Sequence, residues 1–173
     1  MRVADRIALW LGERGITHAF GIVGGGNVTL FDAIAKAKKT QIVCCHHEQA
    51  AAMASTYFNR TRGNLSSVVL VTTGAGSSNA LTGVLAAHMD GIPLLVISGN
   101  EASKYMNAKT RIWGVQGYDS SGIMNPMIGE RCYRILHKDD WDIAVNHAFV
   151  NSTTPRQGAC WLDIPKDIAN AMV

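Results

Sequence analysis

The chain has 173 residues, of which 47% are hydrophobic and 17% are charged, and its formal net charge is +3. A chain of this length and apolar content can bury the core of one globular domain without disulfides or metals, and it is too poor in charge to be disordered. The lysine and arginine residues are scattered, apart from Lys36, Lys38 and Lys39, so we expect no nucleic-acid partner.

The sequence gives no sign of a membrane or secreted protein. No apolar stretch reaches the roughly 20 residues that a membrane span needs, and Met1 leads into an amphipathic segment instead of a signal peptide. The cysteines are Cys44, Cys45, Cys132 and Cys160. They show no C-x-x-C spacing, so we expect buried thiols in a reducing compartment, no membrane partner and a cytoplasmic protein.

The predicted elements alternate along the chain. A helix comes first, over residues 2–14, and Gly15 provides its stop. Short apolar runs, most of them β-branched, then predict strands at 16–22, 41–45, 67–73, 93–98 and 159–164. Helical patterns lie at 27–38, 48–60, 77–89 and 139–151. Because parallel crossovers are long enough to hold a helix, this order predicts a single-domain α/β fold, a mostly parallel sheet with helices on both faces.

Residues 99–128 interrupt this alternation. They contain several glycines and Pro126 with no clear period, so we predict a long loop. Loops of this length inside compact domains are more often functional than decorative, and this one leaves the carboxyl end of a strand, where open α/β sheets bind ligands.

Glycine-rich turns follow three of the predicted strands, at 21–26, at 72–79 and at Gly99. Glycine lets the backbone approach a ligand closely, but such turns also suit any α/β sheet. The first turn lacks the G-x-G-x-x-G spacing, and no acidic residue follows at the distance that would hold a ribose, so we do not expect a nicotinamide dinucleotide.

Glu48 is the strongest candidate for chemistry. It lies in the first turn of a predicted helix that continues as an alanine run. A glutamate there ordinarily only interacts with the helix dipole, but small residues let the helix pack closely, so the carboxylate could be buried and share a proton with a ring nitrogen. His46 and His47 have no further ligand at metal spacing, and no nucleophile motif indicates a hydrolase.

The order of motifs resembles the amino-terminal pyrimidine-binding domain of thiamine-diphosphate enzymes of the acetolactate synthase type. The resemblance runs nearly end to end and rests on GIVGGG at 21–26, HHEQAAAMA at 46–54, VTTGAGSSNALTGVLAAHMDGIPLLVISG at 71–99, VQGYDSSGIMNPM at 115–127 and WLDIPKDI at 161–168. It implies that residues 1–173 form this pyrimidine-binding domain and act on a 2-keto acid.

The resemblance implies two catalytic residues. Glu48 would hydrogen-bond N1′ of the aminopyrimidine of thiamine diphosphate and so activate the cofactor, and Gln116 would lie near the reacting carbon. The implied cofactor-binding residues are Ile22, Val23, Gly24, Glu48, Thr72, Ala75, Asn79 and Gln116. The histidine pair of simple decarboxylases is missing from this neighbourhood, which favours carboligation over plain decarboxylation.

Departures from the family pattern leave the substrate undefined. Ile22 and Val23 stand where the pattern has tyrosine and proline, Ala75 replaces a proline, and Gly117 replaces a glutamate. The Gly-Asp-Gly motif that holds Mg²⁺ and the diphosphate is absent from the sequence. The resemblance therefore implies a separate diphosphate-binding subunit that holds Mg²⁺, a heterodimer or heterotetramer, and a chain that is inactive alone.

Two other hypotheses stay open. One is a non-catalytic or regulatory homologue that keeps the fold, although Glu48 together with the 72–79 turn argues against it. The other is a fragment of a longer enzyme, which is less expected at the amino end, because Met1 is followed at once by a helix.

Overall fold

The computed structural model describes residues 1–106 and 114–173, and in them six parallel strands form one sheet in the order β2-β1-β3-β4-β6-β5. The strands are β1 (His18–Gly21), β2 (Gln41–Cys44), β3 (Ser67–Val71), β4 (Leu94–Asn100), β5 (Cys132–Arg134) and β6 (Ala159–Pro165). The helices are α1 (Val3–Glu13), α2 (Val28–Ala37), α3 (Glu48–Arg62), α4 (Ala75–Asn79), α5 (Leu81–Met89), α6 (Ser103–Met106), α7 (Ser120–Ile128), α8 (Trp141–Thr153) and α9 (Lys166–Asn170), with 3₁₀ turns η1 (Gly114–Gly117) and η2 (Lys138–Asp140).

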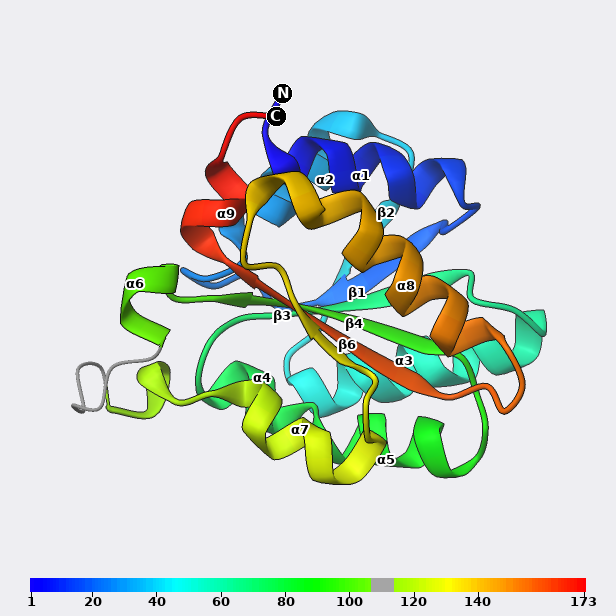
Figure 1. Ribbon diagram of the computed structural model, residues 1–173. Helices are drawn as coiled ribbons and strands as arrows, with labels where there is room; N and C mark the ends of the chain where they lie inside the picture. The colour runs from blue at the N-terminus through cyan, green and yellow to red at the C-terminus, as the bar shows by residue number, and fades with distance from the viewer. Residues whose placement is uncertain (107–113) are drawn as a thin grey trace.

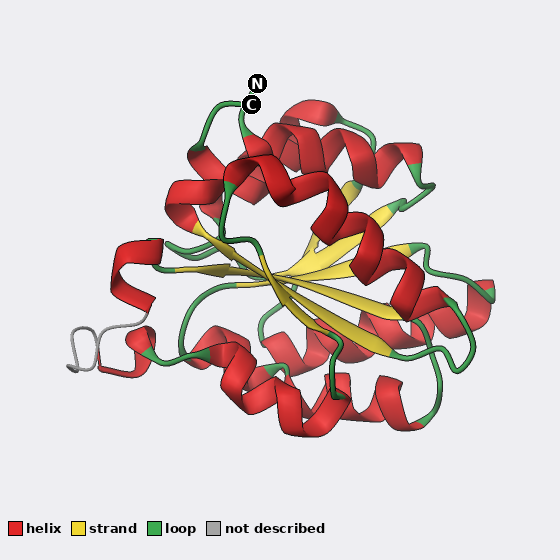
Figure 2. Ribbon diagram, in the orientation of Figure 1, coloured by secondary structure: helices red, strands yellow, loops and turns green. Residues whose placement is uncertain are grey.

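Helices cover both faces of this sheet, which confirms the predicted parallel α/β fold (Figures 1 and 2). Helices α1, α2, α8 and α9 lie on one face, and α3, α4, α5 and α7 lie on the other. Along β3, Val68 and Leu70 belong to the first of two buried clusters, whereas Val69 and Val71 belong to the second. A strand that is buried on both faces needs apolar residues throughout, which explains its continuous apolar run.

Two glycines bring the β1–α2 turn onto the sheet. Gly99 lies inside β4 and not in the turn predicted after it. A Cβ added to Gly99 would lie 2.2 Å from the carbonyl oxygen of Gly26, so the two backbones touch directly. Glycine is required here for close approach, and the contact fixes the first turn over β4.

The long loop predicted over 99–128 is wrong for most of its described part. Strand β4 extends to Asn100, α6 and η1 are short helical turns, and α7 is a regular helix that contains Pro126. Residues 107–113 of that prediction lie outside the described residues.

Capping explains why α7 forms against the composition of its sequence. Asp119 precedes the helix, and its Oδ1 accepts a hydrogen bond from the backbone N–H of Ser121 at 3.0 Å. The buried positions Ser120, Met124 and Ile128 recur every four residues. Because the first of them is polar, the apolar pattern is too sparse to indicate a helix from sequence.

Smaller differences concern elements at the edges of the prediction. Strand β5 and helix α9 were not predicted, β1 begins at His18, and the helix predicted over 77–89 is divided at Ala80 into α4 and α5. Gly15 does end α1, with a φ of 74°. Within the described ranges, no helix is both long enough and apolar enough to cross a bilayer.

The prediction of buried cysteines is wrong for Cys44, which is exposed on the edge strand β2. Cys45 and Cys132 are partly buried, and Cys160 is fully buried. Burial raises the pKa of Cys132 and of Cys160 to about 12, so these two thiols stay protonated at neutral pH.

Candidate active site

Three loops meet at the carboxyl ends of β2, β1 and β3. Strand β1 lies between β2 and β3 in the sheet. After β1 the chain forms β2 on one side of it, and then β3 on the other side, so the strand order reverses at β1. Doubly wound sheets bind ligands at such a reversal point, outside the carboxyl ends of the strands. The loops are the β1–α2 turn at 22–27, the β2–α3 turn at 45–47 and the β3–α4 turn at 72–74.

Glu48 opens α3 and is buried at this edge, with 7% of its surface exposed. His47 caps the helix, since its Nδ1 accepts the backbone N–H of Gln49 at 3.2 Å. Asn79, at the end of α4, donates from Nδ2 to Glu48 Oε2 at 3.0 Å. Among the described residues, none donates a hydrogen bond to Oε1. Asn79 therefore fixes the carboxylate by Oε2, and the lone pairs of Oε1 stay available to a ligand.

Small residues let α3 approach its neighbours closely. Ala51 and Ala52 are fully buried, and a Cβ added to Gly83 of α5 would lie 2.5 Å from the Cβ of Ala52. A Cβ added to Gly76 would lie 3.2 Å from Glu48 Oε1. The alanine run therefore allows the close helix packing that its composition suggested. Glu48 is enclosed because these helices lack bulky side chains where they meet.

The β1–α2 turn is closed by Asn27, which sequence reasoning missed. Its side chain is fully buried, its Oδ1 accepts from the Gly24 N–H at 2.7 Å, and its Nδ2 donates to the Ile22 carbonyl at 3.0 Å. Asn27 is the first residue of the helix predicted over 27–38, and asparagine at a helix start is a capping signal that could have found it. Val23, in the same turn, is exposed.

The β3–α4 turn contacts the first turn through Thr72. Thr72 Oγ1 accepts from the Gly26 N–H at 3.1 Å, and a Cβ added to Gly24 would lie 2.6 Å from the Thr72 side chain. The structure thus places Gly24, Thr72 and Glu48 at one edge, with Gly76 packed between Thr72 and Glu48. Ala75 is exposed and offers only a small apolar side chain.

Gln116 reaches the same turn from η1, far along the chain. Its Oε1 accepts a hydrogen bond from Thr73 Oγ1 at 2.7 Å. Gly74 has a φ of 65°, and a Cβ there would lie 2.7 Å from Gln116 Oε1. Both the backbone conformation and the space require glycine at this position.

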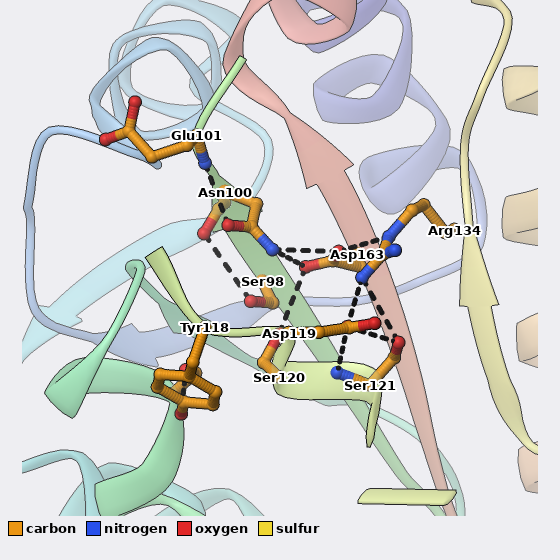
Figure 3. Close-up of polar contacts among 11 residues, drawn as sticks. Ser98, Asn100, Glu101, Tyr118, Asp119, Ser120, Ser121, Arg134 and Asp163 are labelled. Atoms are coloured by element: carbon orange, nitrogen blue, oxygen red, sulfur yellow. Dashed lines mark hydrogen bonds and ion pairs between the residues drawn. The ribbon is translucent and has the colours of Figure 1, made fainter. Parts of the chain in front are cut away.

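A partly buried ionic network, also missed from the sequence, adjoins this edge (Figure 3). Asp163 of β6 is fully buried, and both its oxygens accept from Asn100 Nδ2 at 3.0 Å. Arg134 donates from Nε to Asp163 at 2.8 Å and from Nη2 to Asp119 at 2.5 Å. The network joins β4, β5 and β6 to the start of α7.

Burial and charge oppose one another within this network. Burial raises the pKa of Asp163 above its usual range, against the opposing effects of Arg134 and Asn100. Burial by itself would lower the pKa of Arg134, but the charge of Asp163 and the hydrogen bond to Asp119 outweigh it and raise that pKa. Arg134 is therefore firmly protonated.

The polar groups at this edge suit a heterocyclic ring better than a metal ion. Within residues 1–106 and 114–173, no three His, Cys, Asp or Glu side chains are grouped so that they could hold a metal. One carboxylate oxygen without a partner, next to glycine and alanine, can accept a hydrogen bond from a ring N–H and leave room for the ring itself.

Asn79→Asp should destabilise the fold at neutral pH, because it places a second carboxylate against Glu48. We expect a loss of about 1–3 kcal/mol in the free energy of unfolding at pH 7, from a lost hydrogen bond and like-charge repulsion. The loss should shrink near pH 4, where carboxyl groups take up protons. Urea unfolding at both pH values measures it, with the exposed Asn125→Asp on α7 as the control. Equal losses for both variants would contradict the contact.

Comparisons with known proteins agree on one family. A family profile described as "Thiamine pyrophosphate enzyme, N-terminal TPP binding domain" matches residues 1–123. The acetolactate synthase large subunit of Buchnera aphidicola subsp. Schizaphis graminum is 34% identical over 165 residues, which are 95% of this chain and 28% of that protein. The acetolactate synthase isozyme 3 large subunit of Escherichia coli K12 is 32% identical over 96% of this chain and 28% of its own length. Acetolactate synthase of Bacillus subtilis 168 is 33% identical over 98% of this chain, again 28% of its own length.

Proposed function

We propose that this chain binds the aminopyrimidine ring of thiamine diphosphate and activates the cofactor through Glu48. The proposal starts from the family: the chain belongs to the thiamine pyrophosphate enzymes, as an N-terminal TPP binding domain. The observation that carries the proposal is the buried Glu48 carboxylate, which Asn79 holds by one oxygen while the other has no partner among the described residues. The domain would comprise residues 1–173.

Residues of this chain would bind the aminopyrimidine ring and hold the proton at its N1′ atom. Glu48 Oε1 would accept the hydrogen bond of N1′, and Asn79 would keep the carboxylate in the orientation that this bond needs. Thr72 and Gly24 would bound the ring, with Ile22, Val23 and Ala75 as apolar surface and Gln116 beside the substrate. When bound, thiamine diphosphate supplies the carbon nucleophile for attack on a keto carbon.

The diphosphate group needs a further domain. The chain spans 28% of the length of each relative named above, and the residues that the structure describes offer no acidic cluster for Mg²⁺. We propose that a separate subunit binds Mg²⁺ and the diphosphate, that the two form a heterodimer or heterotetramer, and that this chain is inactive alone. The relatives' names support acetolactate synthase-like carboligation of a 2-keto acid, with decarboxylation as the simpler reaction.

Co-expression with a candidate diphosphate-domain subunit tests this function. The pair should co-purify and release carbon dioxide from pyruvate or 2-ketobutyrate, with thiamine diphosphate and Mg²⁺ present, whereas neither chain should do so alone. Analysis of the products then separates a hydroxyketo acid from an aldehyde. A stable pair that binds the cofactor but turns over no 2-keto acid would favour the non-catalytic homologue instead.

A further inference from the structure

We infer that Tyr118 is a positioning residue that holds the segment at 114–119 on the β3–α4 turn, and so orients Gln116 toward the 2-keto acid. The inference rests on the proposed function and deepens it. It assigns the control of substrate binding to Tyr118, a residue outside the cofactor site. The segment at 114–119 is called the Gln116 segment below.

A hydroxyl cluster makes the first anchor. The Tyr118 hydroxyl donates to the Gly74 carbonyl at 2.9 Å and lies 2.6 Å from Ser77 Oγ. Ser77 is fully buried, and its Oγ lies 2.8 Å from the same carbonyl oxygen, so the two hydroxyl protons are shared among these three oxygens. Gly74 also touches the segment's main chain, since a Cβ there would lie 2.7 Å from the Val115 carbonyl oxygen. The turn and the segment are therefore in direct contact across about forty residues of sequence.

The ionic network makes the second anchor. Asp119, the neighbour of Tyr118, bonds Arg134, and Arg134 bonds the buried Asp163 (Figure 3). The far end of the Gln116 segment is thereby tied to β5 and β6, which pair with each other in the sheet. With that end fixed, the Tyr118 hydroxyl determines how closely the rest of the segment lies on the turn.

This placement decides what Gln116 can do. Thr73 donates to its Oε1, so the amide is turned with Nε2 available as a donor, and no described residue accepts from that nitrogen. An amide N–H can hydrogen-bond a carboxylate or keto oxygen, the groups that a 2-keto acid carries. Helix α4, which follows this turn directly, contacts Glu48 through Gly76 and Asn79, so one short stretch of chain relates the cofactor-activating carboxylate to the substrate donor.

Hydrogen exchange on the isolated chain tests the anchor itself. Tyr118→Phe removes one hydroxyl and should speed the exchange of backbone N–H groups in the Gln116 segment at least tenfold. The matched control is Tyr133→Phe, which removes the hydroxyl bonded to Asn151 of α8 and should leave that segment unchanged. Equal exchange in wild type and Tyr118→Phe would overturn the anchor.

Kinetics of the assembled enzyme test the substrate role, with pyruvate as the probe. Tyr118→Phe should raise the KM for pyruvate about tenfold, with thiamine-diphosphate affinity within twofold of wild type. In a Gln116→Ala background the same change should have less than a twofold effect, because the side chain that it positions is gone. Additive effects of the two substitutions, or an unchanged KM, would overturn the inference. A wild-type assembly without turnover would overturn the proposed function and the substrate role together, while hydrogen exchange would still decide the anchor.

Discussion

Glu48→Gln should lower the turnover of the assembled enzyme by at least about 100-fold and leave the fold intact. Glutamine keeps the shape of the side chain, and its carbonyl oxygen can still accept the hydrogen bond from Asn79. The other end of the amide, however, is an NH₂ group, which cannot accept a proton or a hydrogen bond from N1′. Steady-state turnover of a 2-keto acid and urea unfolding of the same variant together measure the effect.

Glu130→Gln is the matched control, because Glu130 is exposed and precedes the amino end of β5, whereas the three site loops lie at the carboxyl ends of their strands. It should retain wild-type turnover. A loss of turnover in Glu48→Gln alone is then caused by the loss of the Glu48 carboxylate and not by the change of net charge. Wild-type-like turnover of Glu48→Gln would contradict the role of Glu48 in activating the cofactor.

Asp163→Ala should lower the free energy of unfolding by about 3–5 kcal/mol, the cost of breaking a buried ion pair from one side. Asp163 is fully buried, and its removal leaves Arg134 Nε and Asn100 Nδ2 without their acceptor. Because Arg134 also bonds Asp119, the start of α7 should loosen as well. Denaturant unfolding followed by circular dichroism measures the loss.

The exposed pair of Arg60 and Asp90 gives the control for that experiment. Their charged groups lie 3.7 Å apart, with more than half of each side chain exposed, so Asp90→Asn should cost less than about 1 kcal/mol. If Asp163→Ala does not accumulate as a folded protein, Asp163→Asn removes only the charge and should still cost about 1–3 kcal/mol. A loss near that of the Asp90 control would contradict the structural role of the network.

Regular elements were predictable because local composition and burial agree there. The β-branched run of β3 is buried on both faces, and Gly15 ends α1 with the left-handed backbone that glycine favours. The enclosure of Glu48 was foreseen for a similar reason, since small alanine side chains next to a helix-opening carboxylate allow close packing.

Features that depend on distant partners could not be predicted. Strand β5 has only three residues, all partly exposed, so no alternating pattern identifies it. Asp163 gives no local sign of its partners, because Asn100 and Arg134 reach it from other strands. The contact between Gln116 and Thr73 likewise joins segments that only the fold brings together.

Binding of thiamine diphosphate, measured by calorimetry with Mg²⁺ present, tests the central claim most directly. The titration is made on this chain alone and then on its mixture with a candidate diphosphate-domain subunit. We expect no measurable binding by the chain alone and tight binding by the mixture, since Glu48 meets only the ring. Tight binding by the single chain would contradict the shared site, because it would require a diphosphate anchor within these 173 residues.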